Sequence, residues 1–99
     1  MSNKPLLLIV DDDPLISDSL SHAFAAEFDI VTSHARPHCL ALLRQLRQTP
    51  QVALVDLGLP PQPHRPDEGF ALIGELLAHA PEMKIIVLSG QNGDDNARH

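Results

Sequence analysis

Blocks of apolar residues alternate along the chain with polar segments, in a pattern that predicts strands and helices in turn. Leu6 to Val10 is a continuous apolar run that ends in acids, which is typical of a strand buried on both faces. Further strands are predicted at residues 29–33, 52–55 and 84–88. Between the strands, apolar residues recur at steps of three to four, as they do on one face of a helix. The predicted order is therefore βαβαβαβ.

The three predicted helices have recognisable start or stop residues. The first begins at Asp13-Pro14, because Asp is a favoured N-cap and Pro a favoured first helical residue. Its apolar face is expected to hold Ile16, Leu20, Ala23, Phe24 and Phe28. The second helix starts at Pro37 and is stopped by Thr49-Pro50, and the third runs from Phe70 to Ala80. The stretch 60–66, which contains four prolines, is predicted to be a loop.

This order of elements predicts an α/β fold of three layers, αβα, with a mostly parallel sheet, right-handed crossovers and helices on both faces. Ligands of such sheets bind beyond the carboxyl ends of the strands. The functional residues are therefore expected where the strands end.

Composition narrows the class of protein. The chain has 99 residues, 43% of them apolar and 20% charged, so we expect one ordinary globular domain. Its longest apolar run is too short to span a bilayer, and no signal peptide is visible, so no contact with a membrane is expected. The single cysteine, Cys39, fits a reducing, cytoplasmic location. A net charge of −6 argues against direct binding of nucleic acid.

Three of the four predicted strands end in a polar side chain: Asp11 and Asp12 follow the first, Asp56 the third and Ser89 the fourth. The carboxyl ends of parallel strands share one edge, so these residues should converge. Two carboxylates about 4 Å apart repel by roughly 4 kcal/mol at an effective dielectric near 20. Such a cluster is predicted to bind Mg²⁺, with Mn²⁺ as the alternative. One carboxylate could then act as a nucleophile toward phosphorus, and the Ser89 hydroxyl could bond a phosphoryl oxygen.

The segments 8–14 (LIVDDDP), 55–60 (VDLGLP) and 86–90 (IVLSG) resemble the receiver domains of two-component response regulators. The resemblance implies a flavodoxin-like sheet of order 2-1-3-4. It implies a metal site made by Asp11, Asp12, Asp56 and the backbone carbonyl of Gly58. It also implies that a sensor histidine kinase phosphorylates Asp56 and that Ser89 senses the phosphoryl group. The domain would then be a phosphoacceptor rather than an enzyme, and it would control an output domain, transcriptional and of the ATPase plus DNA-binding type that sigma-54 activators carry.

The sequence departs from the family pattern at two places. The glycine that opens the third helix, Gly69, comes about five residues late, after an insertion within residues 61–68. The 99 residues also end before the fifth strand and its lysine, so residues 1–99 are expected to be a receiver domain that is incomplete at its C-terminus. Strand 84–88 would then be a sheet edge, through which two copies are expected to pair or to exchange strands.

Two other functions remain open from the sequence. In a haloacid-dehalogenase-like phosphatase, Asp11 would be the nucleophile and Asp13 the acid–base, although that family gives no reason for Asp56. A receiver-like binding module that is never phosphorylated would keep the fold without the chemistry. For single residues we expect Asp13 to be a helix cap and Cys39 a buried thiol, and we do not expect His34 and His38 to bind zinc.

Overall fold

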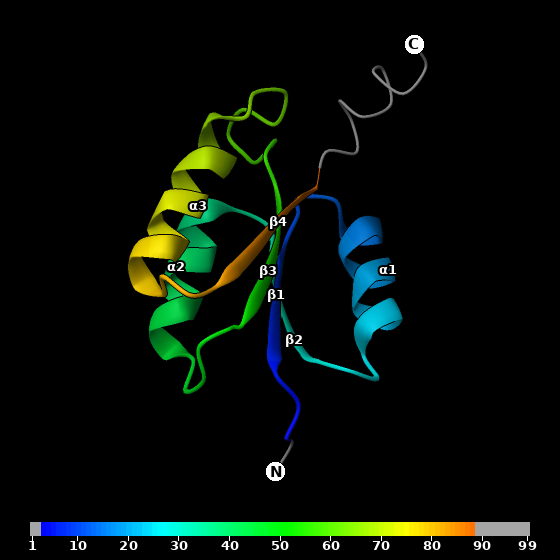
Figure 1. Ribbon diagram of the computed structural model, residues 1–99. Helices are drawn as coiled ribbons and strands as arrows, with labels where there is room; N and C mark the ends of the chain where they lie inside the picture. The colour runs from blue at the N-terminus through cyan, green and yellow to red at the C-terminus, as the bar shows by residue number, and fades with distance from the viewer. Residues whose placement is uncertain (1–2, 89–99) are drawn as a thin grey trace.

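The computed structural model describes residues 3–88, and it contains four strands and three helices in the predicted order. Their bounds are β1 Leu6–Val10, α1 Pro14–Phe24, β2 Asp29–Ser33, α2 Arg36–Gln45, β3 Val52–Asp56, α3 Asp67–His79 and β4 Lys84–Leu88. The sheet forms the middle layer, with α1 on one face and α2 and α3 on the other (Figure 1). The predicted three-layer αβα architecture is confirmed.

All neighbouring strands in this sheet are parallel, and their order is β2-β1-β3-β4. Val10 at the end of β1 pairs with Ser33 on one side and with Val55 on the other, and Asp56 pairs with Leu88. The carboxyl ends of the four strands are therefore level at one edge of the sheet. The flavodoxin-like order 2-1-3-4 is confirmed.

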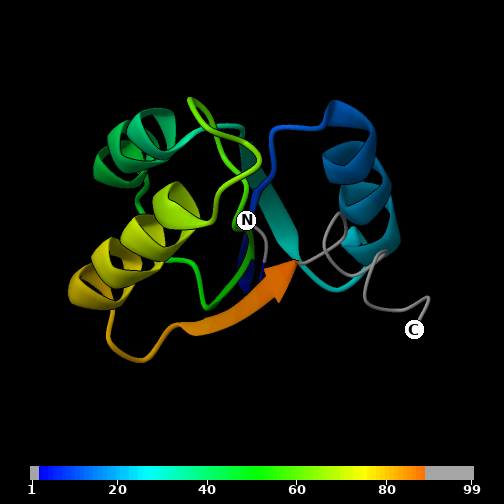
Figure 2. The ribbon, with the colours of Figure 1, turned by 90° about the horizontal axis from the view of Figure 1, so that it is seen from above.

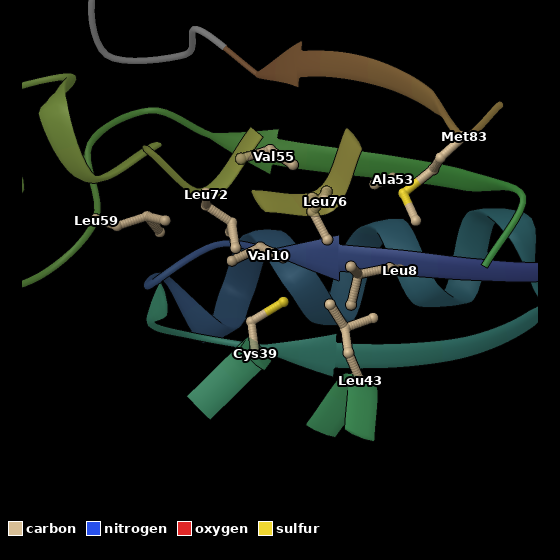
Figure 3. Close-up of a cluster of buried hydrophobic side chains, with 10 residues drawn as sticks. All are labelled: Leu8, Val10, Cys39, Leu43, Ala53, Val55, Leu59, Leu72, Leu76 and Met83. Atoms are coloured by element: carbon tan, nitrogen blue, oxygen red, sulfur yellow. The ribbon is translucent and has the colours of Figure 1, made fainter. Parts of the chain in front are cut away.

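Two apolar clusters cover the two faces of the sheet. The larger one lies between the sheet and the helices α2 and α3 (Figure 3), and its buried members are Leu8, Val10, Cys39, Leu43, Ala53, Val55, Leu59, Leu72, Leu76 and Met83. The smaller one, on the α1 face, holds the buried residues Leu7, Ile9 and Leu54. Because β1 contributes to both clusters, all five of its residues are buried, as its unbroken apolar run predicted.

Helix α1 covers less of the sheet than its periodicity predicted. It ends at Phe24, so Phe28 lies beyond it, although the two rings still pack edge to face with centroids 6.2 Å apart. Ile16, expected on the inner face, has 44% of its surface exposed, and Ala23 is exposed too. Leu20, Phe24 and Phe28 make the contact with the smaller cluster. The main contacts of α1 are with β1 and β2, on one face of the sheet (Figure 2).

The other two helices differ from prediction only at their ends. Helix α2 ends at Gln45, one residue before Leu46, whose amide still donates to the carbonyl of Leu42. Helix α3 begins at Asp67, three residues earlier than predicted, because Asp67 and Glu68 are acids in a first turn that favours them. The proline-rich stretch between Pro60 and Pro66 is a loop, as expected, and residues 61–66 are exposed.

Within residues 3–88, no helix has the length and apolar character needed to cross a membrane. Strand β4 is bonded to β3, and Ile86 and Val87 on it are 52% and 42% exposed. The association of two copies through this strand stays a prediction.

Candidate metal centre

Three carboxylates from two strand ends converge at the edge of the sheet where β1 and β3 end. Asp11 and Asp12 follow β1, and Asp56 is the last residue of β3, its neighbour in the sheet. One oxygen of each lies within 4.8 Å of the others. Asp11 is buried, and Asp12 and Asp56 are half-buried. The sequence predicted that these three residues meet, and the structure brings them together.

Backbone amides fix the orientation of two of these carboxylates. The amide of Asp13 donates to Oδ1 of Asp11 over 2.9 Å, and the amide of Gly58 donates to Oδ1 of Asp56 over 3.0 Å. The backbone of Asp11 is itself held, since its amide donates to the carbonyl of Ser33 at the end of β2. The acids are therefore held at fixed positions by the loops that follow β1 and β3.

Asp13 has a different task from its two neighbours. Its side chain accepts a hydrogen bond of 3.0 Å from the amide of Leu15, and it is the N-cap of α1. The predicted capping role is confirmed. This carboxylate caps the helix and is not a member of the acid cluster.

Burial and mutual repulsion make the clustered acids hard to ionise. Burial raises the pKa of Asp56 to about 6. The hydrogen bond from the Gly58 amide lowers this pKa, and the nearby charges of Asp11 and Asp12 raise it. The pKa of Asp11 is also raised, first by burial and then by the charges of Asp12 and Asp13. A cluster of buried, mutually repelling carboxylates becomes more stable when it takes up a proton or a cation.

The donor set fits a small, hard divalent cation. Carboxylate oxygens are the ligands that Mg²⁺ prefers, and such sites commonly use one or two carboxylates with the rest of the shell left to water or substrate oxygens. Asp11, Asp12 and Asp56 form the one group of three or more acidic, His or Cys ligands close enough to share an ion within the described part of the chain. The predicted acid site therefore has the chemistry and spacing that a cation requires.

The loop that follows β3 returns tightly to the start of α3. The carbonyl of Leu57 accepts hydrogen bonds from the amides of Leu59 and Gly69, at 3.0 and 3.2 Å. Gly69 lies so close to Leu57 that a Cβ atom on it would be 2.3 Å from the Leu57 Cα. Gly58, between Leu57 and Leu59, is buried. The late glycine noted in the sequence thus closes the base of the proline-rich loop.

A cavity of about 420 Å³ opens beside Asp11 and Asp12. Its lining includes Ser17, Asp18, Thr32 and His34, which the sequence analysis had not placed at this edge. Their approach depends on how the β1–α1 and β2–α2 loops bend, and no local sequence pattern specifies that.

The remaining candidates have the following outcomes. Ser89 lies outside the described residues, so its predicted role stays a prediction. The rings of His34 and His38 stack with centroids 4.9 Å apart, and Nδ1 of His38 lies 2.7 Å from the hydroxyl of Ser33. Neither belongs to a group that could hold a metal in the described part of the chain. Cys39 is buried, as predicted, and burial raises the pKa of its thiol to about 11.

The fold and the acid cluster together define an α/β domain with a candidate cation site at the carboxyl edge of its sheet. The chain belongs to the response regulator receiver domain family, whose model matches residues 7–99. It is thus a receiver domain of a two-component response regulator, and the family is one of phosphoacceptors rather than of catalytic enzymes.

Individual relatives agree with this assignment. The chain is 31% identical over 98 residues to the transcriptional regulatory protein AruR of Pseudomonas aeruginosa, and the match covers 95% of this chain and 38% of that protein. It therefore spans less than half the length of that relative. A CheY-like response regulator receiver domain protein of Methanospirillum hungatei JF-1 is 26% identical, with a TM-score of 0.73, and the match covers 97% of this chain and 75% of that one.

A further structure with the same fold is a response regulator of Burkholderia pseudomallei with a phosphorylated aspartic acid, a calcium ion and citrate. It is 24% identical with a TM-score of 0.73, and the match covers 88% of this chain and 48% of that one. The receiver family assignment also removes the haloacid-dehalogenase-like alternative, whose acid–base residue, Asp13, is the cap of α1.

Proposed function

We propose that this domain accepts a phosphoryl group on Asp56 from a phosphohistidine of a sensor kinase, with Mg²⁺ held beside it. The observation that carries the proposal is the approach of three carboxylates, Asp11, Asp12 and Asp56, to within 4.8 Å at the carboxyl edge of a parallel sheet. These residues and the backbone carbonyl of Gly58 would hold the ion, and Mn²⁺ would serve as an alternative. The calcium ion and phosphorylated aspartic acid of the Burkholderia protein support this reading.

The side chain of Asp56 has the properties of a phosphoryl acceptor. Its pKa of about 6 leaves it ionised at pH 7.5, and the bond from the Gly58 amide fixes its orientation. A carboxylate oxygen of Asp56 attacks phosphorus, an O–P bond forms, the P–N bond of phosphohistidine breaks, and the imidazole leaves with the electron pair and takes up a proton. The bound ion would supply neutralisation of charge on the phosphoryl oxygens.

The consequence of phosphorylation would be a shift between two states of the domain. In this proposal the hydroxyl of Ser89 bonds the phosphoryl group, and its loop moves with it toward Asp56. An output domain in the whole protein would read that change. The AruR relative, a transcriptional regulatory protein, supports a transcriptional output. A cytoplasmic location stays a prediction. An ATPase plus DNA-binding output of the sigma-54-activator type stays a prediction.

Labelling with a small phosphodonor tests the acceptor role. Acetyl phosphate with Mg²⁺ should add the mass of one phosphoryl group to the chain, and peptide mapping should locate it on Asp56. EDTA and the variant Asp56→Asn should both abolish the label. Glu82→Gln is the matched control, since Glu82 is an exposed acid that precedes β4, at the end of the strands opposite the cluster, and it should label like the wild type.

A receiver-like module that is never phosphorylated predicts a different result. Neither acetyl phosphate nor beryllofluoride would then modify or bind the chain, with or without Mg²⁺. That outcome in the full-length protein would overturn the proposed function.

A further inference from the structure

We propose that Arg36 is a positioning residue for the cation site: through Glu68 it holds the start of α3, and with it the loop that carries Gly58. The inference rests on the proposed function, because it concerns the same site. It names residues that lie outside the acid cluster and that the family motifs do not include.

The contact itself is a three-residue ion-pair cluster between the two helices on one face of the sheet. Arg36, the first residue of α2, donates from Nε and Nη2 to the two carboxylate oxygens of Glu68, at 3.0 and 3.4 Å. Its Nη1 donates to both oxygens of Glu75, at 3.1 and 3.0 Å. The guanidinium is therefore engaged along two sides, by acids at the start and in the middle of α3.

This cluster is better placed than an ordinary surface ion pair. The side chains of Arg36, Glu68 and Glu75 are 29%, 22% and 40% exposed, and a fork-shaped contact fixes geometry as well as charge. By contrast, the pair between Arg65 and Asp67 spans 3.3 Å with both side chains more than half exposed. Pairs of that exposed kind contribute little to stability.

The position of Arg36 is itself informative. A cation in the first turn of a helix is disfavoured by the helix dipole, so its presence at the start of α2 calls for a partner. Glu68 and Glu75 supply it, and the hydrogen bonding of the guanidinium to Glu68 is the largest cause that raises its pKa. The arginine is therefore placed to bind α3 and not to stabilise its own helix.

The path from Glu68 to the cation site is short. Glu68 is followed by Gly69, whose amide donates to the carbonyl of Leu57, and the two backbones touch with no room for a side chain. Leu57 lies between Asp56 and Gly58, the acceptor and the proposed carbonyl ligand. Any shift of the first turn of α3 is therefore passed directly to the backbone on both sides of Leu57.

The inserted loop explains why such a restraint is needed. Residues 61–66 are exposed, and Pro66 at the N-cap of α3 provides no side-chain hydrogen bond to its first turn. The first turn of the helix therefore has no side-chain cap of its own and depends on contacts with other parts of the chain. Arg36 provides such a contact from α2, through Glu68 in the first turn of α3.

Calorimetric titration of the full-length protein with Mg²⁺ tests the inference. Arg36→Met and Glu68→Gln should raise the Kd for Mg²⁺ by about 3- to 10-fold, less than the roughly 10- to 100-fold typical of residues bonded directly to a metal ligand. Arg36→Lys, which keeps the charge but loses the fork, should fall between them and the wild type. The amide NMR resonance of Gly58, recorded without Mg²⁺, should shift in the same order.

Glu75→Gln is the matched control, because Glu75 bonds the same guanidinium but is remote from Gly69 in the helix. It should lower the thermal stability as Glu68→Gln does and leave the Kd for Mg²⁺ within twofold of the wild type. If Glu75→Gln weakens Mg²⁺ binding as much as Glu68→Gln, or if neither does, the cluster is merely structural and the inference fails. If the wild-type protein binds no Mg²⁺, the proposed function fails first and this inference falls with it.

Discussion

Burial of Asp56 disfavours the ionised form of its carboxyl group. In the folded chain its pKa is about 6, above the ordinary value of 3.8, chiefly because of burial and then because Asp11 and Asp12 repel it. The folded protein therefore holds a proton at this site between about pH 4 and pH 6 that the unfolded chain has already lost. The contribution of this residue to the free energy of unfolding is fully present below about pH 4 and is lost as the pH rises through about 6.

Replacing this charge should stabilise the domain when no Mg²⁺ is present. We expect Asp56→Asn to raise the free energy of unfolding at pH 7.5 by about 1–2 kcal/mol, after allowance for the partial exposure of the side chain. Urea unfolding in EDTA at pH 4.5 and pH 7.5 measures this, and the gain should shrink at the lower pH. Asn at this position thus trades the proposed acceptor function for stability.

Glu82→Gln removes the same charge elsewhere and serves as the control. Glu82 is exposed and precedes β4, at the edge of the sheet opposite the acid cluster. Its effect should stay within about 0.5 kcal/mol at both pH values. Equal gains from the two substitutions would mean that the overall negative charge, and not the site, is responsible.

At the scale of elements, helix α3 offers two glycines in opposite surroundings. A Cβ on Gly69 would meet the backbone of Leu57 at 2.3 Å, whereas a Cβ on Gly74 would meet nothing within 4 Å. Gly69→Ala should therefore destabilise the domain by about 1–3 kcal/mol, because the backbone must move apart. Gly74→Ala should stabilise it by about 0.5–1 kcal/mol, since Ala is the better helix former.

Thermal unfolding of the two variants gives this comparison directly. The substitution is chemically identical and both positions lie in α3, so helix propensity alone predicts the same sign for both. Only the close approach of α3 to the β3–α3 loop predicts opposite signs. Two stabilised variants would show that the contact between Gly69 and Leu57 is looser than described.

The elements of this fold could be predicted because their causes are local. A buried central strand needs an unbroken apolar run, which β1 has, and Asp13-Pro14 is a local signal for a helix start. The convergence of Asp11, Asp12 and Asp56 followed from one non-local rule, that parallel strands end at the same edge. These parts needed no knowledge of how the helices pack.

What could not be predicted depends on the packing of whole elements. Periodicity placed Ile16 on the inner face of α1, but the helix covers too little of the sheet to bury it. The pairing of Arg36 with Glu68 spans 32 positions and joins the starts of two helices. Neither segment alone contains a pattern that predicts this pairing. The cavity beside Asp11 depends likewise on the course of two loops.

For the molecule as a whole, binding of Mg²⁺ and folding should be coupled. The ion is expected to bind the three clustered carboxylates only when the fold brings them together, so it should stabilise the native state over the unfolded one. At a concentration 100 times the Kd, the gain is about 2.7 kcal/mol. For a domain of this size, that should raise the Tm by more than about 10 °C. KCl at the same ionic strength controls for general screening of the net charge of −6.

The same coupling should reverse the dependence of stability on pH. Without Mg²⁺, ionisation of Asp56 and Asp11 costs stability as the pH rises, because the folded state raises the pKa of both. With saturating Mg²⁺, the ion needs both carboxylates deprotonated, so the stability it adds should grow as the pH rises through about 6. Plots of Tm against pH with EDTA and with Mg²⁺ should therefore diverge from about pH 5 upward, falling in one and rising in the other. Asp56→Asn should bring the two plots closer together, because it removes a ligand and one of the two titrating groups at once. Parallel plots for the wild type would mean that Mg²⁺ binds somewhere other than the acid cluster, or does not bind at all.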